Sequence, residues 1–140
     1  MIDQRSAGPE KRPMNLLIVD DSLTMRNMIK RVLGMTGLRV GEVYEAGNGR
    51  EALDVLEAHE VEVLLTDINM PVMTGTELLR AVAENPRWRS LRRVIISTDG
   101  STARREEVAG LHVRCYLEKP ITPEIVRDVL TAVTDSDLHA

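Results

Sequence analysis

Short apolar runs alternate along the chain with segments in which apolar residues recur at helical spacing. The runs are short enough for strands buried on both faces of a sheet, and they occupy residues 16–19, 40–46, 61–66, 94–96 and 113–117. A segment with helical spacing follows each run, and these segments cover residues 25–35, 48–56, 74–82, 101–110 and 122–133. Strands that alternate with helices predict a parallel sheet with right-handed crossovers and helices on both faces. The pattern therefore predicts a doubly wound α/β fold with five strands and five helices.

Polar residues stand where several of these helices are expected to begin or end. Thr74 and Glu77 have the spacing of a capping box, in which each side chain accepts a hydrogen bond from the backbone N–H of the other residue. Asn48 and Glu51 show the same spacing. Pro86 is expected to end the third helix, because the residue before a proline avoids the helical conformation.

Residues 1–13 are expected to form a flexible N-terminal tail, because Gly8, Pro9 and Pro13 interrupt a polar stretch with little to pack. The length of 140 residues suits one domain, which we place at residues 14–137. A domain of this size can bury roughly two-thirds of its unfolded surface. The chain therefore has enough apolar material for a core of its own.

Composition and charge exclude several classes of protein. The formal net charge of −4 disfavours a basic nucleic-acid or membrane binder, and one Trp and two Tyr are too few for a base-stacking surface. The single cysteine, Cys115, excludes an internal disulfide and a cysteine-rich zinc site. No apolar run approaches the ~18 residues of a membrane span, and no signal-peptide core is present. These features favour a cytoplasmic protein that inserts into no membrane and binds no nucleic acid.

Polar side chains follow four of the predicted strands at their carboxyl ends. They are Asp20 and Asp21 after the first strand, Asp67 after the third, Ser97 and Thr98 after the fourth, and Lys119 after the fifth. In an open parallel sheet, ligands bind beyond these ends, near the point where the strand order reverses. With the order 2-1-3-4-5, the first and third strands are neighbours at that point. The sequence therefore predicts a site that brings three carboxylates, a hydroxyl and an ammonium together.

Three carboxylates in one corner repel one another unless a cation lies among them. Such oxygen ligands suit Mg²⁺, with Mn²⁺ as a substitute, whereas Zn²⁺ is disfavoured because no Cys or His falls at these positions. A metal ion and a lysine beside an aspartate suit phosphoryl transfer with that aspartate as the nucleophile. Taken singly, Asp20 and Asp21 could cap the first helix and Lys119 could be an ordinary surface charge. The functional interpretation depends on their joint placement at four strand ends.

Four motifs carry a resemblance to a known family, and they lie at residues 16–22, 65–75, 96–98 and 116–120. Over about residues 14–134 the chain resembles the response-regulator receiver domain of bacterial two-component signalling. The resemblance implies a flavodoxin-like, CheY-like (βα)5 fold with the strand order 2-1-3-4-5.

The resemblance also implies a role for each strand-end residue of the acidic corner. Asp67 matches the phosphoacceptor, and Lys119 matches the residue that pairs with the phosphoryl oxygens. Asp21 and Asp67 would bind Mg²⁺ through their side chains, Asn69 through its backbone carbonyl, and Asp20 mostly through water.

A second pair of residues matches the conformational switch of the family. Ser97 matches the switch hydroxyl, which would also bind the phosphoryl group, and Tyr116 matches the switch aromatic. Counting back from Lys119 without gaps reaches Ser97, and Thr98 is the secondary candidate.

The resemblance implies a stand-alone CheY-like response regulator that accepts a phosphoryl group on Asp67 from a sensor histidine kinase. It would signal through a downstream protein target that binds the face formed by the fourth helix, the fifth strand and the fifth helix. It would be a switch rather than an enzyme, with only slow autophosphorylation and autodephosphorylation. One alternative is a phosphorelay intermediate that passes the group to a histidine phosphotransferase, and another is a receiver excised from a larger regulator.

A phosphohydrolase with an aspartate nucleophile is an alternative of a different class. The run Asp67-Ile68-Asn69 resembles the nucleophile motif of haloacid-dehalogenase-type phosphatases. Those enzymes carry further acidic ligands late in the chain, whereas here the acidic pair precedes the nucleophile. A P-loop nucleotide enzyme is excluded, because no Gly-Lys-Ser/Thr follows any predicted strand.

Overall fold

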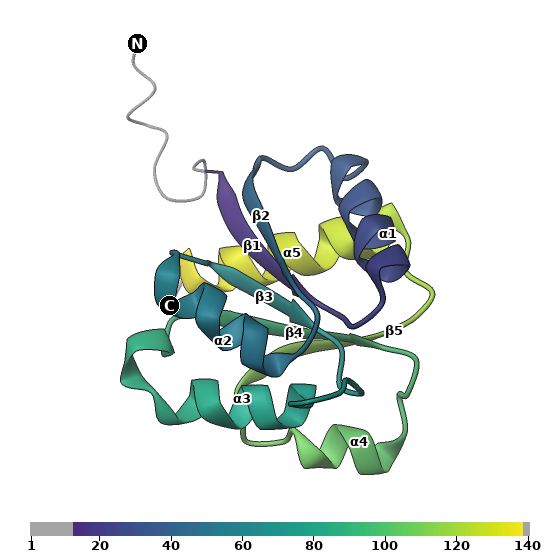
Figure 1. The fold of residues 1–140 in the computed structure, drawn as a ribbon. Coiled ribbons are helices and arrows are strands. Elements are labelled where there is room, and N and C mark those ends of the chain that lie inside the picture. The colour runs from purple at the N-terminus through teal and green to yellow at the C-terminus, as the bar shows by residue number, and fades with distance from the viewer. Residues whose placement is uncertain (1–12, 139–140) are drawn as a thin grey trace.

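The computed structural model describes the backbone of residues 13–138 and the side chains of residues 13–134. Five parallel strands form one sheet in the order β2-β1-β3-β4-β5, which confirms the predicted topology (Figure 1). The strands are β1 (Met14–Val19), β2 (Val40–Ala46), β3 (Val63–Thr66), β4 (Arg92–Ser97) and β5 (Val113–Glu118). The helices are α1 (Leu23–Gly34), α2 (Gly49–Ala58), α3 (Gly75–Glu84), α4 (Thr102–Glu107) and α5 (Pro123–Leu138).

The predicted tail at residues 1–13 lies outside the described residues except for Pro13. The domain limits at residues 14 and 137 stay a prediction.

The sheet is covered on both faces, and each face has its own apolar cluster. Helices α1 and α5 lie on one face, and α2 and α3 lie on the other (Figure 1). Because successive side chains of a strand point to opposite faces, Leu16 and Ile18 pack with α1 and α5, whereas Leu17 and Val19 pack with α2 and α3. All four side chains are buried. The unbroken apolar run of β1 therefore reflects a strand that has no solvent-facing side.

The predicted capping box at Thr74 is present in full, whereas the one at Asn48 is present only in part. At Thr74 both contacts of the capping box are present, as predicted. Asn48 accepts a hydrogen bond from the N–H of Glu51 at 2.9 Å, but Glu51 Oε1 accepts from the N–H of Gly47 at 2.8 Å. The second contact of the expected box thus goes to the residue before the cap.

Two boundaries differ from those that the apolar pattern indicated. Strand β3 begins at Val63 rather than at residue 61, and α4 ends at Glu107 rather than at residue 110. Gly110 and His112 adopt positive φ angles of 87° and 62°, which turn the chain towards β5. A short 3-10 helix, Pro86–Trp88, follows α3, so the proline ends that helix as predicted.

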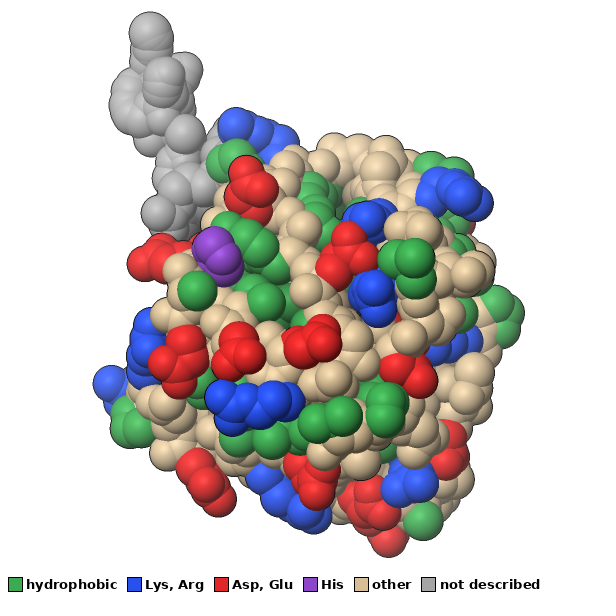
Figure 2. All heavy atoms as spheres, viewed as in Figure 1, with side chains coloured by type: hydrophobic (Ala, Val, Ile, Leu, Met, Phe, Trp, Pro, Cys, Tyr) green, Lys and Arg blue, Asp and Glu red, His purple; other side chains and the backbone are tan. Residues whose placement is uncertain are grey.

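The surface over α2, α3 and α4 mixes charges of both signs. Figure 2 shows acidic and basic side chains interspersed on this face, with hydrophobic side chains in small groups between them. Across the described residues, no helix combines the length and apolar character needed to cross a bilayer.

Candidate metal and phosphoryl site

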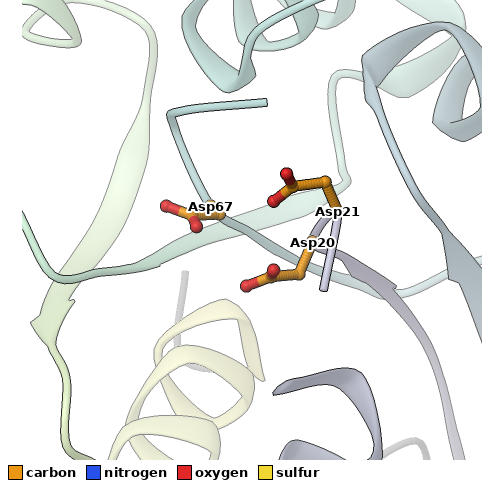
Figure 3. Close-up of side chains that lie close together, drawn as sticks. All are labelled: Asp20, Asp21 and Asp67. Carbon is orange, nitrogen blue, oxygen red and sulfur yellow. The ribbon is translucent and has the colours of Figure 1, made fainter. Parts of the chain in front are cut away.

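Asp20, Asp21 and Asp67 converge at the carboxyl edge of the sheet. Their carboxylates turn towards a common space (Figure 3), and one oxygen of each lies within 4.8 Å of the others. Asp20 and Asp21 follow β1 directly, and Asp67 follows β3, which pairs with β1 from Leu16↔Val63 to Val19↔Thr66. The strand order predicted this convergence, because β1 and β3 are neighbours where the order reverses.

The buried carboxylate of Asp20 is fixed by its surroundings. Asp20 is 2% exposed, its N–H donates to the Ala46 carbonyl at 3.1 Å, and its Oδ1 accepts from the N–H of Ser22 at 2.9 Å. Ser22 is the N-cap of α1, because its side chain accepts from the N–H of Met25. Ser22 therefore caps α1 in place of Asp20 or Asp21. Neither carboxylate is needed as the N-cap, so both can serve as ligands at the acidic corner.

Lys119 supplies the ammonium expected from the end of β5. Its Nζ lies 2.9 Å from Asp20 Oδ2 and 3.3 Å from Asp67 Oδ2. Its backbone N–H donates to the Ser97 carbonyl at 2.9 Å, so the pairing of β4 with β5 fixes where the side chain begins. Lys119 is thus held against two of the three carboxylates.

The charge balance of the corner fits a divalent cation. One ammonium faces three carboxylates, and exposed Asp21 forms no ion pair with any described residue. The available ligand atoms are all oxygens, which suits a hard cation such as Mg²⁺ or Mn²⁺ rather than Zn²⁺. The residues present therefore fit a metal of that class.

Backbone hydrogen bonds fix both ends of the loop between β3 and α3. Asp67 Oδ1 accepts from the N–H of Ile68 at 2.7 Å, and the Ile68 carbonyl accepts from the N–H of Gly75 at 2.8 Å. Further along, the N–H of Gly49 at the start of α2 donates to the Met73 carbonyl at 2.9 Å. At Gly75, an added Cβ would lie 2.0 Å from the Asp67 carbonyl oxygen, so only glycine allows this close approach.

The same loop exposes Asn69 and Val72. Asn69 is exposed, and its Oδ1 accepts from Arg104 Nη2 at 3.3 Å. Val72 has a φ of 68° and is 82% exposed. A β-branched residue rarely adopts this conformation, so the loop between β3 and α3 carries backbone strain at Val72.

Ser97 and Thr98 differ in burial at the end of β4. Ser97 is fully buried, and its Oγ accepts from the N–H of Asp99 at 3.1 Å. Thr98 is exposed and lines a small hollow with Lys119. The two neighbours therefore point to different surroundings, as the alternation of side chains along a strand requires.

Tyr116 packs partly buried against the α2–α3 cluster, with its hydroxyl donating to the Asp99 carbonyl. Burial raises the pKa of this phenol, so it stays protonated and able to donate. The guanidinium of Arg105 lies over its ring at 4.4 Å from the centroid, and Arg105 Nε donates to the Gly100 carbonyl at 3.0 Å. Residues 99 and 100 thus connect Tyr116 to α4.

Sequence reasoning missed Asp99 and Arg104. Arg104 Nε donates to Asp99 Oδ2 at 3.1 Å, and the same guanidinium reaches Asn69. Hydrogen bonds from Ser101, together with Arg104, hold the pKa of the Asp99 carboxyl below its usual value. Asp99 could have been found, since it continues the polar stretch after β4. Arg104 could not have been found, because nothing in the local pattern shows that its side chain contacts Asn69, which lies 35 residues earlier in the sequence.

Fold and site together define a doubly wound α/β protein with three carboxylates and a lysine gathered where the strand order reverses. The family model of the response regulator receiver domain matches residues 16–131. The chain therefore belongs to the response regulator receiver domain family and is a CheY-like signalling switch. Receivers of this family work between a histidine kinase and a downstream target.

The chain is similar to several chemotaxis proteins. The chain is 38% identical to chemotaxis protein CheY1 of Helicobacter pylori over 121 residues, which cover 86% of this chain and 96% of that protein. It is 40% identical to the chemotaxis protein CheY homolog of Campylobacter jejuni, over 86% of this chain and 92% of that protein. Among solved structures, chemotaxis protein CheY4 of Vibrio cholerae superposes with a TM-score of 0.78 at 32% identity, covering 87% of this chain and 99% of that chain.

Proposed function

We propose that Asp67 accepts a phosphoryl group from the phosphohistidine of a sensor histidine kinase, with Mg²⁺ bound at the acidic corner. The observation that carries the proposal is the placement of Lys119 Nζ against both Asp67 and Asp20, beside the carboxylate of Asp21, which pairs with no described lysine or arginine. This arrangement matches the needs of phosphoryl transfer, which are an oxygen nucleophile and positive charge around the transferred group.

In this mechanism, a carboxylate oxygen of Asp67 attacks phosphorus while the P–N bond of the phosphohistidine breaks. The kinase imidazole leaves with the bonding electron pair and takes up a proton. Bound Mg²⁺ supplies neutralising charge for the phosphoryl oxygens, and Asp20, Asp21, Asp67 and the Asn69 carbonyl would hold it. Lys119 then exchanges its contact with Asp67 for one with a phosphoryl oxygen.

The switch proposal rests on the buried position of Ser97 and its link to Asp99. If the side chain of Ser97 turns so that its Oγ donates to the phosphoryl group, the Oγ would move away from the Asp99 N–H and release the segment whose carbonyl holds Tyr116. One hydrogen bond to a charged group contributes about 1.5–3 kcal/mol. A shift from 1:99 to 99:1 requires roughly 5.5 kcal/mol, so binding of the output partner would have to supply the remainder.

The output partner would bind the face formed by α4, β5 and α5. Tyr116 lies on β5 beneath Arg105 of α4, so movement of the ring would alter this face directly. The chemotaxis relatives favour a target in the chemotaxis apparatus and a cytoplasmic location. A phosphorelay role, in which a histidine phosphotransferase removes the group from Asp67, is the second candidate.

Labelling by acetyl phosphate should depend on Mg²⁺, and Asp21→Asn should raise the Mg²⁺ concentration needed for half-maximal labelling by about 10-fold or more. Loss of a group that only orients a metal ligand already weakens metal binding by about 10- to 100-fold, and Asp21 is proposed as a direct ligand. Because Asp21 is exposed, the fold should survive. Intact-protein mass spectrometry over a Mg²⁺ titration measures the effect, with Mn²⁺ and Zn²⁺ as comparisons. Labelling that is indifferent to added or chelated Mg²⁺ would remove the metal from the proposal.

Ser97→Ala should leave labelling of Asp67 largely intact but weaken its effect on the α4–β5–α5 face. The reason is that the hydroxyl is a coupling group and not the nucleophile. Amide chemical shifts around Tyr116, with and without beryllium fluoride as a phosphoryl mimic, measure the coupling. Thr98→Ala is the matched control, since its side chain is exposed at the neighbouring position. If Thr98→Ala uncouples the face and Ser97→Ala does not, the switch hydroxyl is Thr98.

A further inference from the structure

Two carboxylates of the acidic corner come from consecutive residues, Asp20 and Asp21, but only the first is held by contacts of its own. The Asp20 carboxylate accepts from the N–H of Ser22 at 2.9 Å and from Lys119 Nζ at 2.9 Å. Asp21 is exposed, and its carboxylate accepts no hydrogen bond from a described residue. The position of the Asp21 side chain therefore depends on the backbone that carries it.

The backbone between these two aspartates is held by Arg26 of α1. Its Nη1 donates to the Asp20 carbonyl at 2.6 Å. This carbonyl belongs to the planar peptide unit whose nitrogen is that of Asp21, so a hydrogen bond to its oxygen fixes the plane from which Asp21 departs. The preceding carbonyl, that of Val19, accepts from the N–H of Asp67 at 2.9 Å. The end of β1 is thus held by Asp67 at one peptide unit and by Arg26 at the next.

Arg26 is itself anchored to the neighbouring strand. Its Nε donates to Glu45 Oε1 of β2 at 2.9 Å, and its side chain is only 17% exposed. Lys30, further along α1, donates to Glu45 Oε2 at 2.6 Å. A hydrogen bond from Lys30, opposed by burial and aided by one from Arg26, keeps the pKa of the Glu45 carboxyl below its usual value. The guanidinium is therefore held by a carboxylate that stays ionised at neutral pH.

The two contacts of Arg26 need the shape of a guanidinium. Nε and Nη1 belong to one rigid planar group, so a single side chain reaches the Glu45 carboxylate and the Asp20 carbonyl together. A lysine carries the same charge as a single ammonium on a flexible stem, and it cannot hold both partners in this geometry. Orientation and charge can therefore be separated by substitution at this position.

We propose that Arg26 is a positioning residue for the metal site, which acts through the Asp20 carbonyl to place the carboxylate of Asp21. This inference rests on the proposed Mg²⁺ site at the acidic corner. Groups that orient a metal ligand without touching the metal change metal affinity by about 10- to 100-fold when they are lost. A role through charge alone has the opposite sign, because removing a positive charge near the site favours a bound cation.

Two substitutions test the proposal. Arg26→Lys keeps the charge and loses the planar fork, and Arg26→Gln loses both. Each should raise the Kd for Mg²⁺ by about 10-fold, measured from the amide chemical shifts of Asp21, Ser22 and Asp67 as MgCl₂ is added after treatment with EDTA. In the metal-free protein the amide of Asp21 should already shift in both variants, because its nitrogen shares a peptide unit with the Asp20 carbonyl.

Lys30→Gln is the matched control. It removes the other cation from Glu45 but leaves the contact of Arg26 with the Asp20 carbonyl, so the Kd for Mg²⁺ should not change. Both Arg26 variants keep the pairing of Lys30 with Glu45, and circular dichroism should show that they fold.

The possible outcomes distinguish this inference from the metal site on which it rests. An unchanged Kd in both Arg26 variants, with only urea unfolding affected, would mean that the role is structural and would overturn the proposal. Tighter binding in Arg26→Gln with no change in Arg26→Lys would overturn it in favour of charge alone. Equal weakening by Lys30→Gln would also overturn it, since the effect would then belong to Glu45. Wild-type amides that do not respond to Mg²⁺ would remove the metal site itself, and the role of Arg26 with it.

Discussion

Asp67→Asn should abolish phosphoryl labelling while leaving the fold intact. The asparagine keeps the shape of the side chain and can still accept from the N–H of Ile68, but it has no carboxylate oxygen to attack phosphorus. With acetyl phosphate and Mg²⁺, the wild-type protein should gain one phosphoryl group by mass spectrometry and the variant none. The expected loss is complete rather than graded, because the other carboxylate against Lys119 among the described residues, that of Asp20, is only 2% exposed.

Asp54→Asn provides the matched control for this experiment. Asp54 lies on α2, is exposed and pairs with Arg50 alone among the described residues, so its loss should leave labelling unchanged. Labelling that persists in Asp67→Asn but disappears on replacement of another acidic residue would identify that residue as the phosphoacceptor. Steady release of phosphate from simple phosphomonoesters by the wild-type protein would instead favour the phosphohydrolase alternative.

Gly75→Ala should destabilise the protein by about 3 kcal/mol and slow phosphorylation as well. The new Cβ would lie 2.0 Å from the Asp67 carbonyl oxygen and 2.8 Å from Ile68 Cα. Both are backbone atoms, so no side-chain rotation can relieve the overlap, and either the start of α3 or the Asp67 segment has to move. Urea unfolding measures the loss of stability, and the rate of labelling by acetyl phosphate measures the displacement of Asp67.

Gly34→Ala is the corresponding control, because no atom within 4 Å would meet a Cβ at this last position of α1. It should be neutral or raise the free energy of unfolding by about 0.4–1 kcal/mol, since alanine restricts the unfolded chain more than glycine does. Comparable effects of the two substitutions would show that the close approach at Gly75 carries no special cost.

The sequence was sufficient to predict the acidic corner because a parallel sheet places all its strand ends at one edge. The apolar runs located the ends of β1 and β3, and the order 2-1-3-4-5 made Asp20, Asp21 and Asp67 neighbours without any knowledge of side-chain positions. The apolar run of β1 similarly indicated a strand covered on both faces, since every residue from Leu16 to Val19 is buried.

The contacts of long side chains could not be predicted in the same way. Arg104 reaches Asn69 across the edge of the site, and Arg93 turns inward from β4 to two backbone carbonyls. An arginine near a strand or helix end is most often a solvated charge, and several rotatable bonds separate its guanidinium from the backbone. Only the packed structure shows which arginines become buried or cross to another element.

The loop between Asp67 and α3 is anchored by the N–H groups of Gly49 and Gly75, which fix its two ends to α2 and to the strand end. Ordering the backbone of one residue opposes folding by about 1–2 kcal/mol of conformational entropy. Here that loss occurs once, when the chain folds, and is not repeated each time a metal or phosphoryl group arrives. Ligands of modest affinity can therefore bind and leave Asp67 many times over, with little of their binding free energy consumed in organising the loop around them.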